Sequence, residues 1–556
     1  MIRHHKLVLT TVFAGVGAAI LILIAGATQA QVTTWETPVQ ISDTEGSSGG
    51  PRLVVDRQNT VHLLWSDWID LVSHPPYLQY ASKGLHGEWT EPEFIRELGW
   101  PLWGYFGGNI GIVTGPDGAL HMAWENYRYD DGDDTITYMR RDVGGTWSEV
   151  EEVPHQKVWP SAEQPDIGLG PDGTVHVVYK DWLGPGTQKT IQHVMRLPTG
   201  VWTTTQQVTP IEGDFNLPML AVDDIGNAHL IYTKNYTDHY EFYYAHTNTE
   251  GVWSAPMNMG VSPTPWNSVE QLTSGAGGNI HLVWSEWDQS VIPWQCSVMY
   301  SGKVRSGGWS NPRTLAHHCA TQVAVAADRF GRAHVAWHYD DKLWFAYQNP
   351  EGAFTYPSIA EDSDPYHQYP VDLSIVVDSE GGRHVAWGSN HDGNIWTTSI
   401  TGTISVQSAI TESGGSIYAF AGDTFVEFPS DAVSEAVMVT HASLKGSAPA
   451  GMTEVNFFDL SSQYVSDGLP VTSFAQPYTI TVYYTDADIP GIQESTLGLY
   501  WWQNDGWEKE STSVVDTNKN QVTANLDHMT QFAVLGEGGI TDYYLNLPLV
   551  IGGPAP

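Results

Sequence analysis

The chain has 556 residues with a formal net charge of −39, which argues against a nucleic-acid binder, because phosphate contacts need a Lys- and Arg-rich surface. With 41% hydrophobic and 16% charged residues, it is too apolar for an acidic disordered protein, and its length predicts more than one core. The 55 Gly, 24 Trp and 26 Tyr residues favour an all-β fold with many turns.

Residues 1–30 have the pattern of a secretory signal peptide. Arg3 and Lys6 flank the start of an apolar run over 7–27, and Thr28 and Ala30 are small residues at the −3 and −1 positions of a cleavage site. The apolar run is also long enough for an uncleaved membrane anchor, and membrane contact is expected only through this segment. In both cases we expect an extracellular or cell-surface protein.

One pattern recurs seven times after this segment: a turn, then His, two residues and an aromatic residue. The copies are His62…Trp65, His121…Trp124, His176…Tyr179, His229…Tyr232, His281…Trp284, His334…Trp337 and His384…Trp387. Successive histidines lie 59, 55, 53, 52, 53 and 50 residues apart, which indicates a repeat architecture. Gly precedes the His by three residues except in the first copy, where Asn59 takes the place, since Asn tolerates positive φ.

Each repeat predicts four strands, as in a propeller blade. A short apolar strand precedes the turn, the His strand and a third strand follow, and the fourth begins at an aromatic residue such as Trp253. The N-terminal segment 35–39 matches that last signal, so we expect it to complete the final blade and close the ring. Segment 401–410 competes for this place. The prediction is a seven-bladed β-propeller over 31–410, with six or eight blades as alternatives, and with the histidines as core residues that donate to backbone carbonyls.

The turn Asp142–Trp147 resembles the Asp-box of the sialidase-like (BNR-type) β-propellers. It lies between a third and a fourth strand, as in that family, although Arg140 replaces the Ser of the family pattern. The resemblance implies a propeller fold, and the box itself is structural. Propellers of this kind serve as sialidases, lectins and polysaccharide lyases, so the fold does not settle the function.

The starts of the innermost strands and the loops after the His strands are expected to line one central funnel. Aromatic rings there would stack on sugar C–H surfaces, while carboxylates and amides would bind hydroxyls. The predicted ligand-binding residues are Trp68, Asn109, Tyr127, Gln164, Asp181, Trp182, Asn216, Glu286 and Trp287. We therefore expect non-catalytic recognition of a carbohydrate or glycoconjugate. The alternative is that the aromatic residues cover the blade tops and that the polar residues merely line a wet funnel.

A glycan-cleaving enzyme is the rival class. The sialidase resemblance implies three arginines, a Tyr–Glu nucleophile pair and an Asp acid/base, for which the candidates are Arg52, Asp67, Glu270 and Tyr369. No arginine occurs between Arg196 and Arg305, so two of the three clamp positions remain unfilled. A polysaccharide lyase and a structural surface protein are further alternatives.

No cofactor is expected. Asp130, Asp131, Asp133 and Asp134 form a loop rich in oxygen ligands that could hold Ca²⁺, with a solvated acidic loop as the alternative. The two cysteines, Cys296 and Cys319, predict one disulfide in an oxidising compartment, or else two buried thiols.

The propeller pattern stops near residue 410. Strand alternation continues over 411–536 and predicts a β-sandwich, in which 426–433 resembles the ZU5-like signature. The tail 537–556 contains a short apolar segment that cannot span a bilayer; it is either a sorting tail or a last strand.

Overall fold

The structure, a computed structural model, describes most of residues 35–538. The gaps are 44–45, 69–75, 86, 99–109, 129–132, 156–161, 183–188, 211–212, 237–239, 249, 263–268, 289–294, 319, 321, 341, 350–351, 356, 362–369, 390, 401–404, 420–422, 445–447, 450 and 505. The predicted signal peptide and nearly all of the predicted tail therefore lie outside the described residues. Within the described ranges the regular structure is antiparallel β-strand with short 3-10 turns, and no helix has the length and apolarity that crossing a membrane requires. The chain divides into two compact units, one over 34–402 and the other from residue 403 onward.

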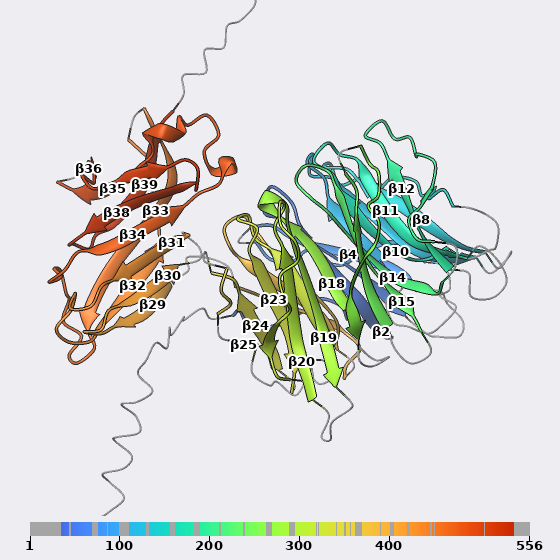
Figure 1. The fold of residues 1–556 in the computed structure, drawn as a ribbon, viewed down its shortest axis with the longest axis horizontal. Coiled ribbons are helices and arrows are strands. Elements are labelled where there is room, and N and C mark those ends of the chain that lie inside the picture. Colours follow the sequence, from blue (N-terminus) through green and yellow to red (C-terminus); the bar gives the residue numbers. More distant parts are fainter. Residues whose placement is uncertain are drawn as a thin grey trace, which may run out of the picture. The chain divides into compact units, whose positions relative to one another are not determined.

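The first unit contains seven four-stranded antiparallel sheets among its described residues (Figure 1). Six of them follow the chain order: β2–β5 (Ser47–Val55, Val61–Trp68, Tyr77–Lys83, Glu93–Glu97), β6–β9 (Ile110–Thr114, Leu120–Arg128, Asp133–Arg141, Glu151–Glu152), β10–β13 (Ala162–Leu169, Val175–Trp182, Lys189–Arg196, Gln206–Gln207), β14–β17 (Phe215–Val222, Ala228–Asn235, Tyr240–His246, Met257–Ser262), β18–β21 (Val269–Gly275, Asn279–Asp288, Gln295–Lys303, Arg313–Ala316) and β22–β25 (Gln322–Ala327, Ala333–Tyr339, Lys342–Tyr347, Ser358–Glu361). A 3-10 turn, η1 (Ala276–Gly278), joins β18 to β19.

The last sheet joins the two ends of this unit. It combines β26–β28 (Pro370–Val377, Arg383–Ser389, Ile395–Ile400) with the N-terminal strand β1 (Val39–Gln40). β1 runs antiparallel to β28, with Val39 opposite Thr397. The segment near the N-terminus thus supplies a fourth strand to a sheet whose other strands lie more than 300 residues later in the chain.

The first strands of the seven sheets contact one another in a cycle. β2 contacts β6, and the series continues through β10, β14, β18 and β22 to β26, which contacts β2 again. Two hydrogen bonds link β26 to β2: the Leu53 N–H donates to the Ser374 hydroxyl at 3.0 Å, and the Gly50 N–H donates to the Asp372 carboxylate at 3.1 Å. The seven first strands therefore surround one common axis.

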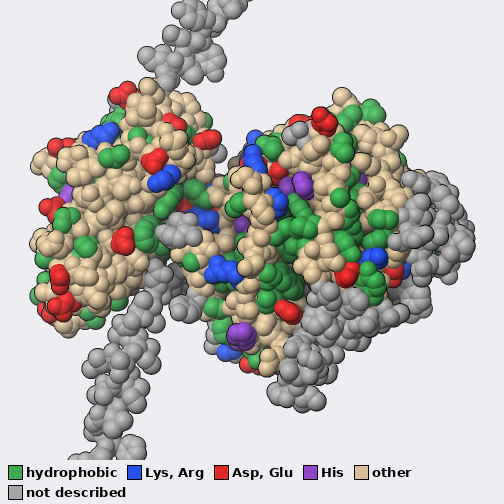
Figure 2. All heavy atoms as spheres, in the orientation of Figure 1, with side chains coloured by type: hydrophobic (Ala, Val, Ile, Leu, Met, Phe, Trp, Pro, Cys, Tyr) green, Lys and Arg blue, Asp and Glu red, His purple; other side chains and the backbone are tan. Residues whose placement is uncertain are grey.

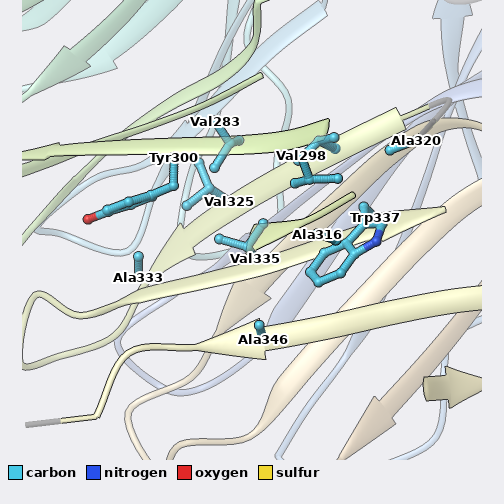
Figure 3. Packing of buried hydrophobic residues seen from close by; sticks show 11 residues of the cluster. Val283, Val298, Tyr300, Ala316, Ala320, Val325, Ala333, Val335, Trp337 and Ala346 are labelled. Carbon is cyan, nitrogen blue, oxygen red and sulfur yellow. The ribbon is translucent and has the colours of Figure 1, made fainter. Parts of the chain in front are cut away.

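Apolar side chains fill the space between neighbouring sheets. Figure 3 shows one such core, in which Val283 and Val298 of one sheet pack with Val325 and Val335 of the next, beside Trp337. The Trp337 ring is fully buried at 0% exposure. Burial of a side chain of this size contributes about 3 kcal/mol through the hydrophobic effect, so each interface between sheets holds part of the stability of the unit.

The repeat turns have the expected backbone geometry. Asn59 has a φ of 58°, which confirms the prediction that it replaces Gly at a positive φ. The Asp56 carboxylate holds this turn by accepting the N–H groups of Gln58 at 2.9 Å and Thr60 at 2.8 Å.

The repeat histidines are buried, but the partner expected for them is wrong in several sheets. The Nδ1 of His62 lies 2.8 Å from the Tyr80 hydroxyl and its Nε2 lies 3.2 Å from the Asp56 carboxylate. His229 has the same kind of partners, Tyr244 and Asp223. Only for His281 do we find the expected carbonyl among the described contacts, that of Gly331 at 3.0 Å. The turn Asp and the third-strand Tyr lie on the same side of the sheet as the His. They therefore replace the expected backbone carbonyl as its hydrogen-bond partners.

The second unit consists of two antiparallel sheets. Six strands form the first sheet, in the order β29 (Ser405–Ile410), β32 (Val437–Ser443), β33 (Met452–Tyr464), β39 (Gln531–Glu537), β35 (Gly498–Gln503) and β36 (Gly506–Lys509). Five form the second, in the order β30 (Gly415–Ala419), β31 (Thr424–Phe428), β34 (Tyr478–Tyr483), β38 (Gln521–Leu526) and β37 (Val514–Asp516), with 3-10 turns η4 (Asp486–Asp488) and η5 (Glu494–Thr496) between strands. Because β29 pairs with β32, segment 401–410 does not supply a strand to the sheet of β26–β28, and the change of pattern falls a few residues before 410.

Candidate functional site

A cavity of about 840 Å³ runs along the common axis of the seven first strands. Its lining comes from β2, β6, β10, β14, β18, β22 and β26, so every sheet of the first unit contributes. On the side of the cavity away from the strand ends the lining is polar, with Arg52, Gln164, Asp166, Gln271, Gln322 and Asp372. At the strand ends a ring of mostly apolar side chains separates this cavity from a second one of about 460 Å³: Val55, Thr114, Leu169, Val222, Ser274, Ala327 and Val377.

Arg52 is the only arginine among the described residues that line the larger cavity. It lies on β2 and is half-buried. Its Nε–H donates to the Ile110 carbonyl at 3.2 Å and its Nη1–H donates to the Pro51 carbonyl at 3.1 Å. These bonds hold the guanidinium between the first and second sheets, at the polar end of the cavity.

Two carboxylates share this region with Arg52. Burial raises the pKa of Asp166 to about 6, although N–H donation from Leu220 at 2.7 Å and from Ile167 at 2.8 Å opposes the rise. Burial also raises the pKa of Asp372, which adopts a φ of 54°. The positive charge of Arg52 favours the ionised form of both groups. The polar end therefore combines one cation with two carboxylates in a confined space, as binding sites for polar ligands do.

The polar side chains of the lining also connect neighbouring sheets. The Gln271 side-chain carbonyl accepts the N–H of Val325 at 2.8 Å, and that of Gln164 accepts the N–H of Leu217 at 3.0 Å. Among the described residues, none accepts a hydrogen bond from the NH₂ group of either glutamine. The carbonyl ends are thus structural, while the two NH₂ groups are donors that a ligand can use.

Of the predicted site residues, the structure brings Arg52 and Gln164 to the cavity, but not Asp67 or Trp68. Asp67 is 2% exposed and accepts hydrogen bonds from the Ser48 hydroxyl at 2.6 Å and the Trp65 indole at 2.8 Å. Trp68 is 5% exposed and donates to the Ser66 hydroxyl. Both belong to β3, whose side chains are all buried, so they pack within the unit and do not form a rim.

The later predicted residues also lie away from the cavity lining. Asp181 is fully buried, and the Trp182 ring has the Lys189 ammonium 4.6 Å from its centroid. Asn216 is buried with its amide donating to Asp214 at 3.1 Å, and Glu286 is partly exposed.

The structure does not describe the side chains of most of the remaining predicted site residues. Asn109, Asp130, Asp131, Cys319 and Tyr369 lie outside the described residues, as do the side chains of Tyr127, Asp133, Glu270 and Trp287. Asp134 is buried, and the described part of the chain contains no group of three or more His, Cys, Asp or Glu side chains that could hold a metal ion. Cys296 is disulfide-bonded, and Cys319 is the only other cysteine in the sequence.

Sequence reasoning missed Asp166. It lies in the middle of β10, whereas the funnel prediction covers only the starts of the innermost strands. In the structure, Asp166 and Gln271 each accept the N–H of the residue 54 positions later, Leu220 and Val325 respectively. These hydrogen bonds connect neighbouring sheets and leave no local signal in the sequence.

The comparisons with known proteins concern the fold. No family model matches the chain, and no curated protein matches it. Among solved structures, it is similar to a polysaccharide lyase, an ulvan lyase bound to -[GlcA(1-4)Rha3S]-, at 11% identity and a TM-score of 0.45, covering 65% of this chain and 95% of the other.

Two further similar structures are an α-L-arabinofuranosidase and an α-L-arabinanase. An α-L-arabinofuranosidase from Fusarium graminearum matches at 13% identity and a TM-score of 0.39, covering 52% of this chain and 92% of that one. An α-L-arabinanase from Penicillium chrysogenum matches at 12% identity and a TM-score of 0.39, covering 66% and 98%. Likeness of this degree assigns neither substrate nor activity to the present chain.

Proposed function

We propose that the first unit is a seven-bladed β-propeller closed by its N-terminal strand, that the second unit is a β-sandwich, and that the propeller binds a glycan in its axial cavity without cleaving it. The seven four-stranded sheets, the pairing of β1 with β28 and the cycle of contacts among the first strands support the propeller. Full closure of this kind leaves no sheet of the ring without a neighbour.

The observation that carries the binding proposal is the polar end of the axial cavity. The volume of about 840 Å³ lies in the range of small-ligand sites. Arg52 and the NH₂ groups of Gln164 and Gln271 supply donors, while Asp166 and Asp372 supply acceptors. A glycan presents many hydroxyl groups, each of which both donates and accepts, so it matches this mixed lining. The cavity offers no aromatic platform among its described lining residues, so hydrogen bonding dominates the recognition.

The described lining favours binding over catalysis. Sialidase-like chemistry would need three arginines, and Arg52 is alone there. The expected acid, Asp67, is buried away from the cavity. A polysaccharide lyase would need a Tyr or His base, and no Tyr or His belongs to the described lining.

We further propose that the protein acts outside the cytoplasm. The signal-peptide pattern of residues 1–30 supports this location, and the disulfide of Cys296 fits an oxidising compartment. Nucleic acid is a poor partner for a chain with a net charge of −39, and on the face that Figure 2 shows, the Lys and Arg side chains of the described residues are scattered.

A broad glycan array followed by isothermal titration calorimetry tests the proposal. We expect at least one oligosaccharide to bind, and Arg52→Gln to weaken its binding about tenfold, because the substitution removes a charged hydrogen-bond donor. Arg57→Gln is the matched control, since Arg57 is an exposed turn residue at the smaller cavity. Absence of any binder would favour a structural surface protein, and equal affinities for the two variants would place the bound glycan outside the axial cavity.

A further inference from the structure

The charges in the axial cavity are few and nearly balanced. Within the described lining, Arg52 carries one positive charge, and Asp166 and Asp372 carry two negative charges when ionised, which leaves a net charge of −1. The other polar lining residues are neutral amides and hydroxyls: Thr114, Gln164, Gln271, Thr273, Ser274, Gln322 and Ser374. An acidic ligand would therefore enter a site that carries no excess of positive charge.

The hydrogen bonds of Arg52 occupy one of the two edges through which its guanidinium could bind an anion. A carboxylate is bound most strongly by two parallel N–H groups of one guanidinium. In Arg52 the Nε–H and the Nη1–H already donate to the backbone carbonyls of Ile110 and Pro51. A ligand would have to displace one of these bonds to obtain a two-pronged contact along the Nε edge.

The two carboxylates act on Arg52 from different sheets. Asp166 lies on β10 and Asp372 on β26, and each feels the positive charge of Arg52. Both carboxylates are fixed by backbone N–H groups, from Leu220 at 2.7 Å and from Gly50 at 3.1 Å, so they cannot turn away from the cavity without losing a hydrogen bond. They therefore offset the positive charge of Arg52 whenever they are ionised.

We infer that the axial cavity binds an uncharged glycan in preference to one that carries carboxylate or sulfate groups, and that Asp166 and Asp372 set this preference by balancing Arg52. The inference rests on the proposed function of the cavity and adds the class of ligand. Asp166 and Asp372 are then specificity-determining residues that favour the hydroxyl groups of a neutral sugar and repel its acidic counterpart.

The test uses an array in which each neutral hexose oligosaccharide is paired with its C6-oxidised uronate form, followed by calorimetry at pH 7.5 on the full chain. The variant is Asp372→Asn, which keeps the shape, can still accept the Gly50 N–H and tolerates the φ of 54°. It brings the net charge of the described lining to zero. Glu91→Gln, which makes the same charge change at an exposed position outside the cavity, is the matched control.

For the native chain we expect the neutral member of a binding pair to bind about tenfold more tightly than the uronate, since one elementary charge in a partly desolvated site has an effect of this order. Asp372→Asn should reduce this ratio to about threefold or less, and Glu91→Gln should leave it unchanged. Tighter binding of the uronates, or a ratio that Asp372→Asn does not alter, overturns the inference and leaves glycan binding intact. If no member of any pair binds, the proposed function fails, and the inference fails with it.

Discussion

Acidification should unfold the first unit, because its repeat histidines are buried and stay neutral in the folded state, whereas they become protonated in the unfolded chain. Burial disfavours the cationic imidazole and lowers the pKa to about 4 in five of them: His121, His176, His229, His281 and His334. In the unfolded chain the pKa of each returns to about 6.5. The stability that the neutral histidines contribute is therefore present above pH 6.5 and is lost as the pH falls from 6.5 towards 4.

The size of the effect follows from the difference in proton binding. At pH 5 each of these histidines is protonated in the unfolded chain and neutral in the folded one, which costs about 2 kcal/mol of unfolding free energy per residue. Five such groups remove about 10 kcal/mol, which is comparable with the whole stability of a typical domain. Asp166 has the opposite effect, because its pKa is raised to about 6 and the folded state therefore takes up a proton as the pH falls. This restores only about 1 kcal/mol of unfolding free energy between pH 7 and pH 5.

The assay is guanidinium-induced unfolding at several pH values between 7.5 and 4.5, followed by tryptophan fluorescence. The unfolding free energy should fall steeply below pH 6.5, and His229→Gln should reduce the loss between pH 7 and pH 5 by about 2 kcal/mol. His317→Gln is the control, since His317 is exposed and should leave the pH dependence unchanged. An unfolding free energy that stays constant down to pH 4.5 would refute the reasoning.

Three further predictions concern the packing of the first unit, each measured by denaturant or thermal unfolding. Gly111→Ala should destabilise by about 1–3 kcal/mol, because a Cβ there would lie 2.6 Å from the Ile167 Cγ2 atom of the next sheet; an unchanged midpoint would contradict this close approach. Trp337→Ala should cost about 3–5 kcal/mol, since it empties a fully buried site, whereas a loss below about 1 kcal/mol would mean that the core collapses around it. Removal of residues 1–43, and with them β1, should lower the melting temperature by several degrees and promote aggregation through the exposed edge of β28, compared with a chain that starts at residue 34; equal melting temperatures and solubility would show that β1 does not hold the sheet.

The repeat period predicts the second strand of each of the seven sheets of the first unit, from Val61–Trp68 to Arg383–Ser389. This worked because a strand covered on both faces needs a buried residue at each position, so its pattern is strict. The partners of the histidines were harder to predict. They depend on which third-strand residue, such as Tyr80, lies opposite the His on the same side of the sheet. That depends on the register between the two strands, which the sequence of one strand alone does not determine.

The sequence predicts some residues of the cavity lining and not others, and the difference lies in where each residue sits in its strand. Arg52 and Gln164 line the cavity as expected of polar residues on innermost strands, and their roles there stay a prediction. Trp68 was misplaced because an aromatic residue at the end of a fully covered strand packs inward as readily as it forms a rim. Asp166 escaped notice because its position inside β10 gives no local sign that the neighbouring sheet presents an N–H group to it.

A crystal structure of the protein with the tightest-binding oligosaccharide from the array tests the central claim most directly. The account predicts the sugar in the axial cavity, with hydroxyl groups hydrogen-bonded to Arg52 and to Asp166 or Asp372. A sugar bound elsewhere on the protein, with the axial cavity holding only solvent, would contradict it.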